Sequence, residues 1–551
     1  MTNALKSEFP VSRLLPEDER RKDGSKHGFT KTPESLPYLA QICKSQWPDN
    51  FNFDIPISLD ADKSNLKDAG GVPQDNVRTV ALKTGVLVRD GGHFEAIFKS
   101  MEDAAEFVEK TGDLIARKLP GLLFDIRLKK LEWHQDKYCL KETGRSLRET
   151  EEKTIAGFGE QILDLPQFED CEVTGMEPAS EWSEFNEKGV SIKRAIGITT
   201  HEKHGASERF RNGKSFDVLG FLREPLKRGF IAGDGNSSDL FPRDFEALAK
   251  KDDGYLAVIV ADGNNVGSRI RGIARDDFFE GWSRREEIFH SIRTGVRKAF
   301  TESLIKVFKG DLEASQKHRN FSFQPLMLGG DDLLMVCGAS KALPFAGEFA
   351  EQVAIQTKEI PQGSLTIGVG VAIVKDSFPF FRAHSLAEQL AVSAKYLKLV
   401  HPGRSYVDWL VISESWHDDL KHIRAKDSKL EIGESTILLT GKPYVIKDDQ
   451  QGSGKTLDNL LSDAARLVPV DADNSKTVAR SQLKRLVGEI AEGEHSGNFA
   501  FLKLPKEQKN ELQNYVVEGK PWEKAGPFKL TRLRDLSEVM ELTALRAAPR
   551  E

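Results

Sequence analysis

The sequence contains few cysteines and no long apolar run. Its 551 residues include four cysteines, at positions 43, 139, 171 and 337, and no two of them form a CxxC pair. Cysteines this far apart indicate neither a disulfide framework nor a complete zinc knuckle, and they fit a reducing cytoplasm. No apolar stretch approaches the roughly 20 residues that span a bilayer. The N-terminal stretch MTNALKSEFPVSRLL lacks a signal-peptide core. We therefore expect a soluble cytoplasmic protein with no membrane partner.

The sequence also lacks a large excess of charge of one sign. The formal net charge is −6 and the isoelectric point is near 6.1. A general attraction for polyanions is therefore not expected, although local basic patches could bind phosphates. Hydrophobic residues make up 39% and charged residues 30% of the chain, which is ordinary for a globular protein. The length predicts three or four domains at about 150 residues each.

The pattern along the chain divides it into five segments. The first is rich in charge and proline, whereas from about Val77 the pattern predicts a β-hairpin with its turn at Asp90-Gly91-Gly92, followed by a helix that Ser100 could cap. A polar stretch of weak periodicity follows, and the last part of the chain is helical, after the linker QQGSGKT. The predicted segments are a polar N-terminal segment (1–75), a first small domain (76–165), an insert (166–250), a central domain (251–415) and a linker with a C-terminal helical domain (416–551).

The central domain has the clearest pattern. Apolar strands are predicted at 255–261, 322–328, 333–337 and 364–374, and long helical patterns follow the first and the third strand. The order is βαββαβ, the ferredoxin-like unit of an α+β fold. A further helix (386–398) and a strand (405–412) extend this domain.

Three carboxylates should meet at one edge of the central sheet. The first and third strands of a βαββαβ unit lie side by side and antiparallel, which brings Asp262, after the first strand, next to Asp331 and Asp332, at the head of the third. Such a cluster repels itself unless cations neutralise it, and two divalent ions about 3.5–4 Å apart would do so while bridging triphosphate oxygens. Mg²⁺ or Mn²⁺ suits an all-oxygen site.

Residues around this cluster suit nucleotide binding. Gly329 and Gly330 permit positive φ and leave room for substrate, and Gly263 lets the backbone approach a phosphate. Asn264 belongs to the same motif. Positive charge for a triphosphate could come from Lys395, Lys398 and Arg404. The alternatives are that GGDD is an ordinary hairpin turn and that the basic residues are a solvated helix end.

The central domain contains the stretches VIVADGNNVG, MLGGDDLLMV, LTIGVGVAIV and HSLAEQLAVSAKYLK. Together they closely resemble the second Palm domain of the large polymerase-cyclase subunit of type III CRISPR effector complexes. The resemblance implies a GGDEF-like domain that makes cyclic oligoadenylates from ATP with Mg²⁺ or Mn²⁺. It implies that Asp262, Asp331 and Asp332 bind the metal ions and that Lys395 contacts the triphosphate. The implied partners are other effector subunits with guide RNA and target RNA, or a second copy of the chain.

The resemblance is weaker outside the central domain. The hairpin around residues 91–94 resembles part of a first Palm domain, in which His93 and Phe94 replace the acidic pair. We therefore expect two ferredoxin-like Palm domains, the first one degenerate or truncated. Cys171 begins a stretch similar to a zinc-binding insert, but no partner cysteines follow, so no zinc is expected. No HD dipeptide occurs in a helical setting, which predicts a variant without the HD nuclease domain.

Two other functions fit the same residues. One is a cyclase that makes another cyclic nucleotide, since no motif specifies the base. The other is a non-catalytic scaffold subunit of an RNA-guided complex, although the intact acidic triplet argues against it.

Overall fold

The computed structural model describes the chain in parts. The described residues are 86–88, 95–96, 105, 108–109, 125–126, 131–134, 137–140, 155–156, 169–175, 177–187, 190–211, 242, 245–271, 278–315, 321–360, 363–397, 402–412, 419–432, 435–447, 455–468, 478–525 and 528–547. The predicted segment 1–75, the turn at 90–92 and residues 450–454 of the predicted linker QQGSGKT lie outside them. Contacts group the chain into one unit of 1–228, 232–239 and 267–294, and a second of 229–231, 240–266 and 295–551. Within the described ranges, no helix is both long and apolar enough to cross a membrane.

The first unit contains short antiparallel strand pairs. The predicted hairpin is found as β1 (Val86–Val88) paired with β2 (Glu95–Ala96). The other pairs are β3 (Asp125–Ile126) with β6 (Ile155–Ala156), β4 (Leu131–His134) with β5 (Lys137–Leu140), and β7 (Glu181–Glu187) with β8 (Val190–Ile196). Helix α6 (Ile198–Arg211) follows β8. The β7–β8 hairpin and α6 give definite structure to a part of the insert where the sequence shows little periodicity.

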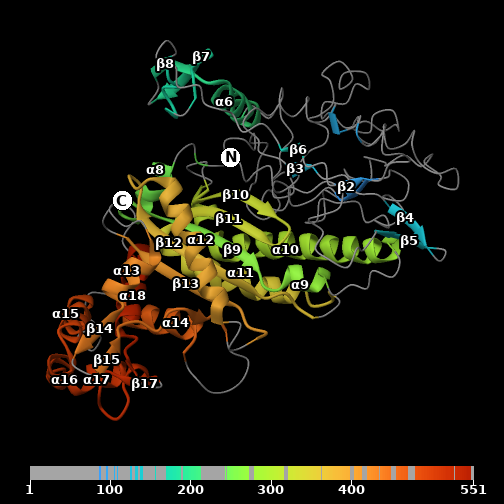
Figure 1. Ribbon diagram of the computed structural model, residues 1–551. Helices are drawn as coiled ribbons and strands as arrows, with labels where there is room; N and C mark the ends of the chain where they lie inside the picture. Colours follow the sequence, from blue (N-terminus) through green and yellow to red (C-terminus); the bar gives the residue numbers. More distant parts are fainter. Residues whose placement is uncertain are drawn as a thin grey trace. The chain divides into compact units, whose positions relative to one another are not determined.

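The second unit is built on a six-stranded sheet, shown in Figure 1. The order β10-β11-β9-β12 is that of a ferredoxin-like βαββαβ unit, and the predicted fold class is confirmed. β13 adds to β12 in parallel, and β16 closes the sheet. The strands are β9 (Tyr255–Gly263), β10 (Phe323–Gly329), β11 (Asp332–Gly338), β12 (Ile367–Lys375), β13 (Tyr406–Val411) and β16 (Tyr444–Val445).

Helices cover both faces of this sheet, which explains why its strands are almost continuously apolar. On one face, Leu390 of α12 (Phe380–Tyr396) belongs to one buried cluster with Val258 of β9 and Val336 of β11. α8 (Phe245–Ala249) and α13 (Leu420–Asp427) contribute to the same cluster. On the other face, Phe300 of α10 (Phe278–Ser315) packs edge-on against Phe345 of α11 (Ala339–Gln356), with ring centroids 5.9 Å apart.

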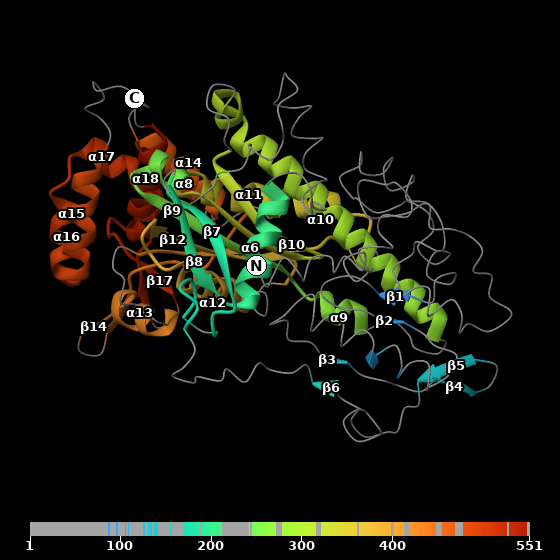
Figure 2. The ribbon, with the colours of Figure 1, turned by 90° about the horizontal axis from the view of Figure 1, so that it is seen from above.

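The C-terminal part of the chain is mixed rather than only helical. A four-stranded sheet of order β14-β15-β18-β17 accompanies the predicted helices. The predicted linker and C-terminal helical domain (416–551) did not include these strands. Figures 1 and 2 show the helices and this sheet gathered into one group. The elements are β14 (Lys429–Ile432), β15 (Ser435–Leu438), β17 (Glu523–Ala525), β18 (Phe528–Leu530), α14 (Leu457–Leu467), α15 (Arg480–Ala491), α16 (Glu494–Leu502), α17 (Lys506–Glu511) and α18 (Leu533–Ala547).

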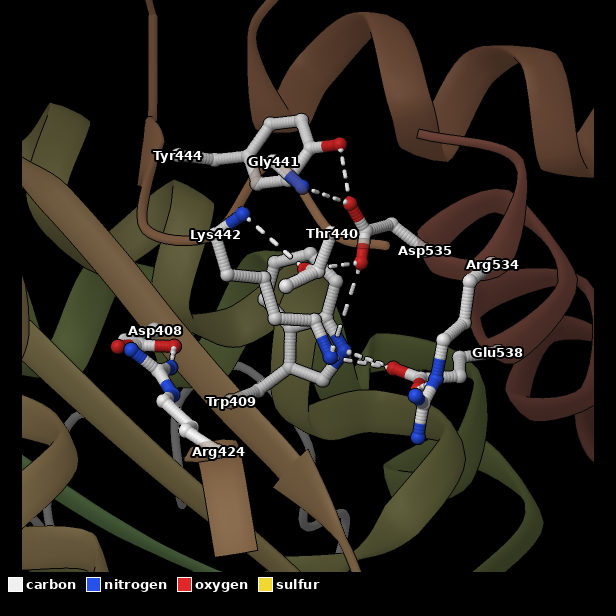
Figure 3. Close-up of polar contacts among 10 residues, drawn as sticks. All are labelled: Asp408, Trp409, Arg424, Thr440, Gly441, Lys442, Tyr444, Arg534, Asp535 and Glu538. Carbon is white, nitrogen blue, oxygen red and sulfur yellow. Dashed lines mark hydrogen bonds and ion pairs between the residues drawn. The ribbon is translucent and has the colours of Figure 1, made fainter. Parts of the chain in front are cut away.

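A buried polar network joins α18 to the large sheet (Figure 3). Asp535 of α18 is completely buried and accepts hydrogen bonds from Thr440 Oγ1 at 2.6 Å, the Gly441 amide at 2.7 Å and the Tyr444 hydroxyl at 2.8 Å. One turn later, Glu538 accepts a hydrogen bond from the Trp409 indole of β13 at 3.0 Å. Because buried carboxylates need such partners, the network fixes α18 against the edge of the sheet.

Candidate metal and nucleotide site

Three carboxylates from two adjacent strands meet at one edge of the large sheet. Asp262 lies near the end of β9, Asp331 lies in the β10–β11 turn, and Asp332 is the first residue of β11. Strand pairing sets Ala261 opposite Leu333, which brings the three acidic residues together across 69 residues of sequence. One oxygen from each carboxylate lies within 4.8 Å of the other two. The structure thus brings together the three residues that the sequence singled out.

The electrostatics of this cluster favour cation binding. Burial, together with the charges of Asp332 and Asp262, raises the pKa of Asp331 to about 7. The cluster is thus short of positive charge even though Lys395 acts in the opposite direction. An all-oxygen donor set with unrelieved negative charge fits Mg²⁺ or Mn²⁺ and does not fit a soft metal. Of the described residues, only these three form an acidic, histidine or cysteine group of this kind.

Lys395 reaches the cluster from α12. Its ammonium forms an ion pair with Oδ2 of Asp262 and donates a hydrogen bond to the Gly263 carbonyl at 3.1 Å. This approach depends on Gly368 of β12, where an added Cβ would lie 2.6 Å from Cγ of Lys395. At Gly370 a Cβ would lie 2.1 Å from the Ala387 carbonyl, so both glycines let α12 lie close to the strand. The sequence offered this signal in the GVG of β12, and our sequence analysis did not use it.

The other glycines of the site have separate roles. Gly330 has a φ of +62°, and a Cβ there would contact nothing within 4 Å, which leaves the turn open. Gly329 is the last residue of β10 and pairs with Asp332, so the positive φ predicted for both glycines occurs at Gly330 alone. At Gly263 a Cβ would lie 2.6 Å from Oδ2 of Asp331. Gly263 therefore makes room for a carboxylate of the cluster.

Asn264 is held beside the cluster by a residue that the sequence analysis missed. The backbone N–H of Asn264 donates a hydrogen bond to the Thr366 carbonyl at 2.7 Å. The side-chain Nδ2 of Asn264 donates a second hydrogen bond to Thr366 Oγ1 at 3.0 Å. Asn264 is only 3% exposed, and its Oδ1 has no hydrogen-bond partner among the described residues. A buried acceptor of this kind suits a ligand that donates a hydrogen bond. Thr366, just before β12, is the residue that orients it.

The remaining predicted basic residues are placed differently. Gly368 pairs with Asp262 on one side and with Tyr406 on the other, so Arg404, just before β13, lies at the same sheet edge but one strand further away. Arg404 is half-buried. Lys398 lies outside the described residues. Lys395 is therefore the predicted basic residue that the structure places on the acidic cluster.

Hydrogen bonds hold the segment around Cys171, which was predicted to have lost a zinc site. Cys171 is buried, and its thiol donates to Thr200 Oγ1 at 3.4 Å. Burial raises the pKa of this thiol, but hydrogen bonds with Thr174, Thr200 and Gly197 outweigh burial and lower the pKa to about 7. Glu177 accepts from the Thr200 amide at 3.0 Å and lies against Gly197, where a Cβ would be 2.2 Å from its Cδ. Hydroxyl and backbone groups of Thr174, Thr200 and Gly197 thus surround the sulfur of Cys171.

Residues 255–398 match the family model of the second palm domain of Cas10/Cmr2. The central domain is thus similar to the second palm domain of Cas10/Cmr2. The matched residues run from the start of β9 to just beyond α12, so they include the acidic cluster and Lys395. The resemblance seen in the sequence to the large subunit of type III CRISPR effector complexes is confirmed for this domain.

Solved structures give weaker similarities over longer stretches. Csm1 from T. onnurineus is 13% identical over 92% of this chain and 65% of its own, with a TM-score of 0.39. A Csm1–Csm4 cassette in complex with pppApApA is 10% identical over 93% and 65%, with a TM-score of 0.40. A Csm1–Csm4 cassette in complex with cA4 is 11% identical over 58% and 40%, with a TM-score of 0.31. The chain thus spans about two fifths to two thirds of the length of these proteins. No curated protein matches it.

Proposed function

We propose that this chain is a metal-dependent nucleotidyltransferase that joins ATP into cyclic oligoadenylates. The observation that carries the proposal is the convergence of Asp262, Asp331 and Asp332, with oxygens within 4.8 Å of one another, on a Cas10/Cmr2-type second palm domain. A simple hairpin turn would not need a third carboxylate from a strand 69 residues earlier. The choice of ATP rests on the resemblance to the polymerase-cyclase family.

Each residue of the site has a distinct part in this proposal. The three aspartates hold Mg²⁺ or Mn²⁺ and are the catalytic residues. Bound there, the metal ions would lower the pKa of an attacking 3′-hydroxyl and stabilise the leaving pyrophosphate. Lys395 supplies positive charge for the triphosphate, and Gly330 leaves the turn open for the substrate. Asn264 offers its buried Oδ1 to a donor group of the nucleotide.

We propose further that activity needs a partner. Joining two nucleotides requires both to be held with one 3′-hydroxyl facing the other α-phosphate. The described residues contain one acidic cluster, which accounts for one nucleotide. The second nucleotide would be held by another subunit of an RNA-guided type III CRISPR complex or by a second copy of this chain. Light scattering after size exclusion, beside ATP assays over a range of protein concentrations, tests this. A monomer with concentration-independent activity contradicts it.

Product analysis tests the nucleotidyltransferase itself. The full-length chain is incubated with each nucleoside triphosphate and Mg²⁺ or Mn²⁺, and products are identified by chromatography and mass spectrometry. We expect cyclic oligoadenylates from ATP and none from the D331A/D332A variant. The matched control is E246A/D376A, which removes two exposed carboxylates near the start of β9 and the end of β12, at the opposite end of the sheet. Equal turnover by D331A/D332A and wild type would contradict the proposed nucleotidyltransferase site. The non-catalytic scaffold would then be the function that fits these residues.

A further inference from the structure

The Lys395 ammonium and a divalent cation would use the same carboxylate. Lys395 is paired with Oδ2 of Asp262, and its side chain is 19% exposed, against 43% for Asp262. It is also held by the Gly263 carbonyl at 3.1 Å, which comes from the residue next to Asp262. The ammonium is therefore a built-in positive charge on one of the three proposed metal ligands and not a solvated helix end.

A metal ion and this ammonium would oppose each other. Both need the lone pairs of the Asp262 carboxylate, and two cations on one carboxylate lie a few ångströms apart, where their repulsion is strong. An ion that binds Oδ2 of Asp262 would therefore have to displace Lys395 from that oxygen. A triphosphate, which is rich in anionic oxygens, would offer the displaced ammonium a new anionic partner.

The backbone around Lys395 supports such an exchange. Gly368 leaves space for the stem of Lys395 to pass over β12, and the stem stays packed there whichever anion the ammonium contacts. The middle of α12 is anchored by close packing of Ala387 and Ala391 against Gly370.

We propose that Lys395 is the internal counter-ion of Asp262, that it competes with the divalent metal for this carboxylate, and that the triphosphate relieves the competition by taking over the ammonium. This inference rests on the proposed function. It makes Lys395 a residue that couples metal binding to nucleotide binding: metal alone binds weakly, and metal and triphosphate bind cooperatively.

Manganese binding with and without nucleotide tests the coupling. Free Mn²⁺ is measured by electron paramagnetic resonance while it is titrated into the full-length chain, alone and with a non-hydrolysable ATP analogue. K395M keeps the apolar stem, and K395Q is a second variant in case one of them folds poorly, which circular dichroism would show. The matched control is K375M, because Lys375 lies at the other end of β12, where it donates to the Asp253 carbonyl at 2.6 Å.

We expect K395M and K395Q to bind Mn²⁺ roughly 1.5- to fivefold more tightly than wild type without nucleotide, the range set by losing one partly exposed ion pair. The increase in Mn²⁺ affinity that the analogue gives to wild type should shrink in both variants, and K375M should behave as wild type. Unchanged or weaker Mn²⁺ binding by both Lys395 variants would overturn the counter-ion role and leave the proposed function intact. Wild-type Mn²⁺ binding that D331A/D332A does not reduce would overturn both.

Discussion

A Cβ at Gly263 would lie 2.6 Å from Oδ2 of Asp331 and 2.8 Å from its Cβ. Gly263 ends β9 and Asp331 lies in the turn before the neighbouring strand β11, and the missing side chain of Gly263 makes the space for the carboxylate of Asp331. The acidic cluster therefore depends on a glycine that could not contact a metal ion through a side chain of its own.

G263A should displace Asp331 and so weaken metal binding and product formation. We expect at least a tenfold loss of activity, with a cost in stability of about 1–3 kcal/mol for overpacking. Calorimetric titration with Mn²⁺ measures metal binding, product analysis measures activity, and thermal denaturation measures stability. The matched control is G267A, since nothing lies within 4 Å of a Cβ at Gly267. Activity of G263A equal to that of G267A would show that Asp331 can move without loss.

Stability without metal should depend on the protonation of Asp331. Its pKa is raised to about 7, above the value of about 3.9 in an unfolded chain, so the folded state holds the proton more tightly. The contribution of this group to stability is therefore largest below pH 4 and falls as the pH rises toward 7. In a chelating buffer, D331N should melt higher than wild type at pH 8, and the difference should vanish near pH 4. A difference that grows toward acid pH would contradict this.

The sequence alone could predict the palm fold and its acidic cluster for a physical reason. Strands that are buried on both faces are continuous apolar runs, and β9, β11 and β12 are of this kind. Once the order βαββαβ is recognised, topology brings Asp262 to Asp331, whatever the length of the chain between them.

Other features left no clear pattern in the sequence. β7 and β8 expose residues on both faces, including Trp182 and Val190, so they lack the alternation that marks a half-buried strand. β17 and β18 are three residues long each, which is too short for a periodic signal. The contact of Lys395 with Asp262 depends on how closely α12 approaches β12, which only tertiary packing determines.

The purified chain should contain no stoichiometric zinc. Among the described residues, Cys171 has hydroxyl and amide groups around it rather than further sulfur or nitrogen ligands, and a closed zinc site needs four such ligands. Elemental analysis after removal of affinity tags measures this directly. One zinc per chain would show that residues outside the described ranges complete a site.

Loss of the Asp535 carboxylate should destabilise the second unit. D535A would leave the groups of Thr440, Gly441 and Tyr444 without their buried acceptor and Lys442 with one carboxylate fewer. Breaking a buried pair of this kind costs roughly 3–5 kcal/mol. Chemical denaturation measures it, with E431A, from the exposed Lys429–Glu431 pair, as the control that should not change. A D535A transition at the wild-type denaturant concentration would mean that the network does not hold α18.

Crystals of the full-length chain grown with Mn²⁺ and a non-hydrolysable ATP analogue would test the central claim most directly, because anomalous scattering locates manganese without reference to any assumed mechanism. We predict two manganese peaks about 3.5–4 Å apart, in contact with Asp262, Asp331 and Asp332 and with the triphosphate of the analogue. A nucleotide bound without manganese at these carboxylates, or manganese bound only elsewhere, would contradict the metal-dependent nucleotidyltransferase proposed for this chain.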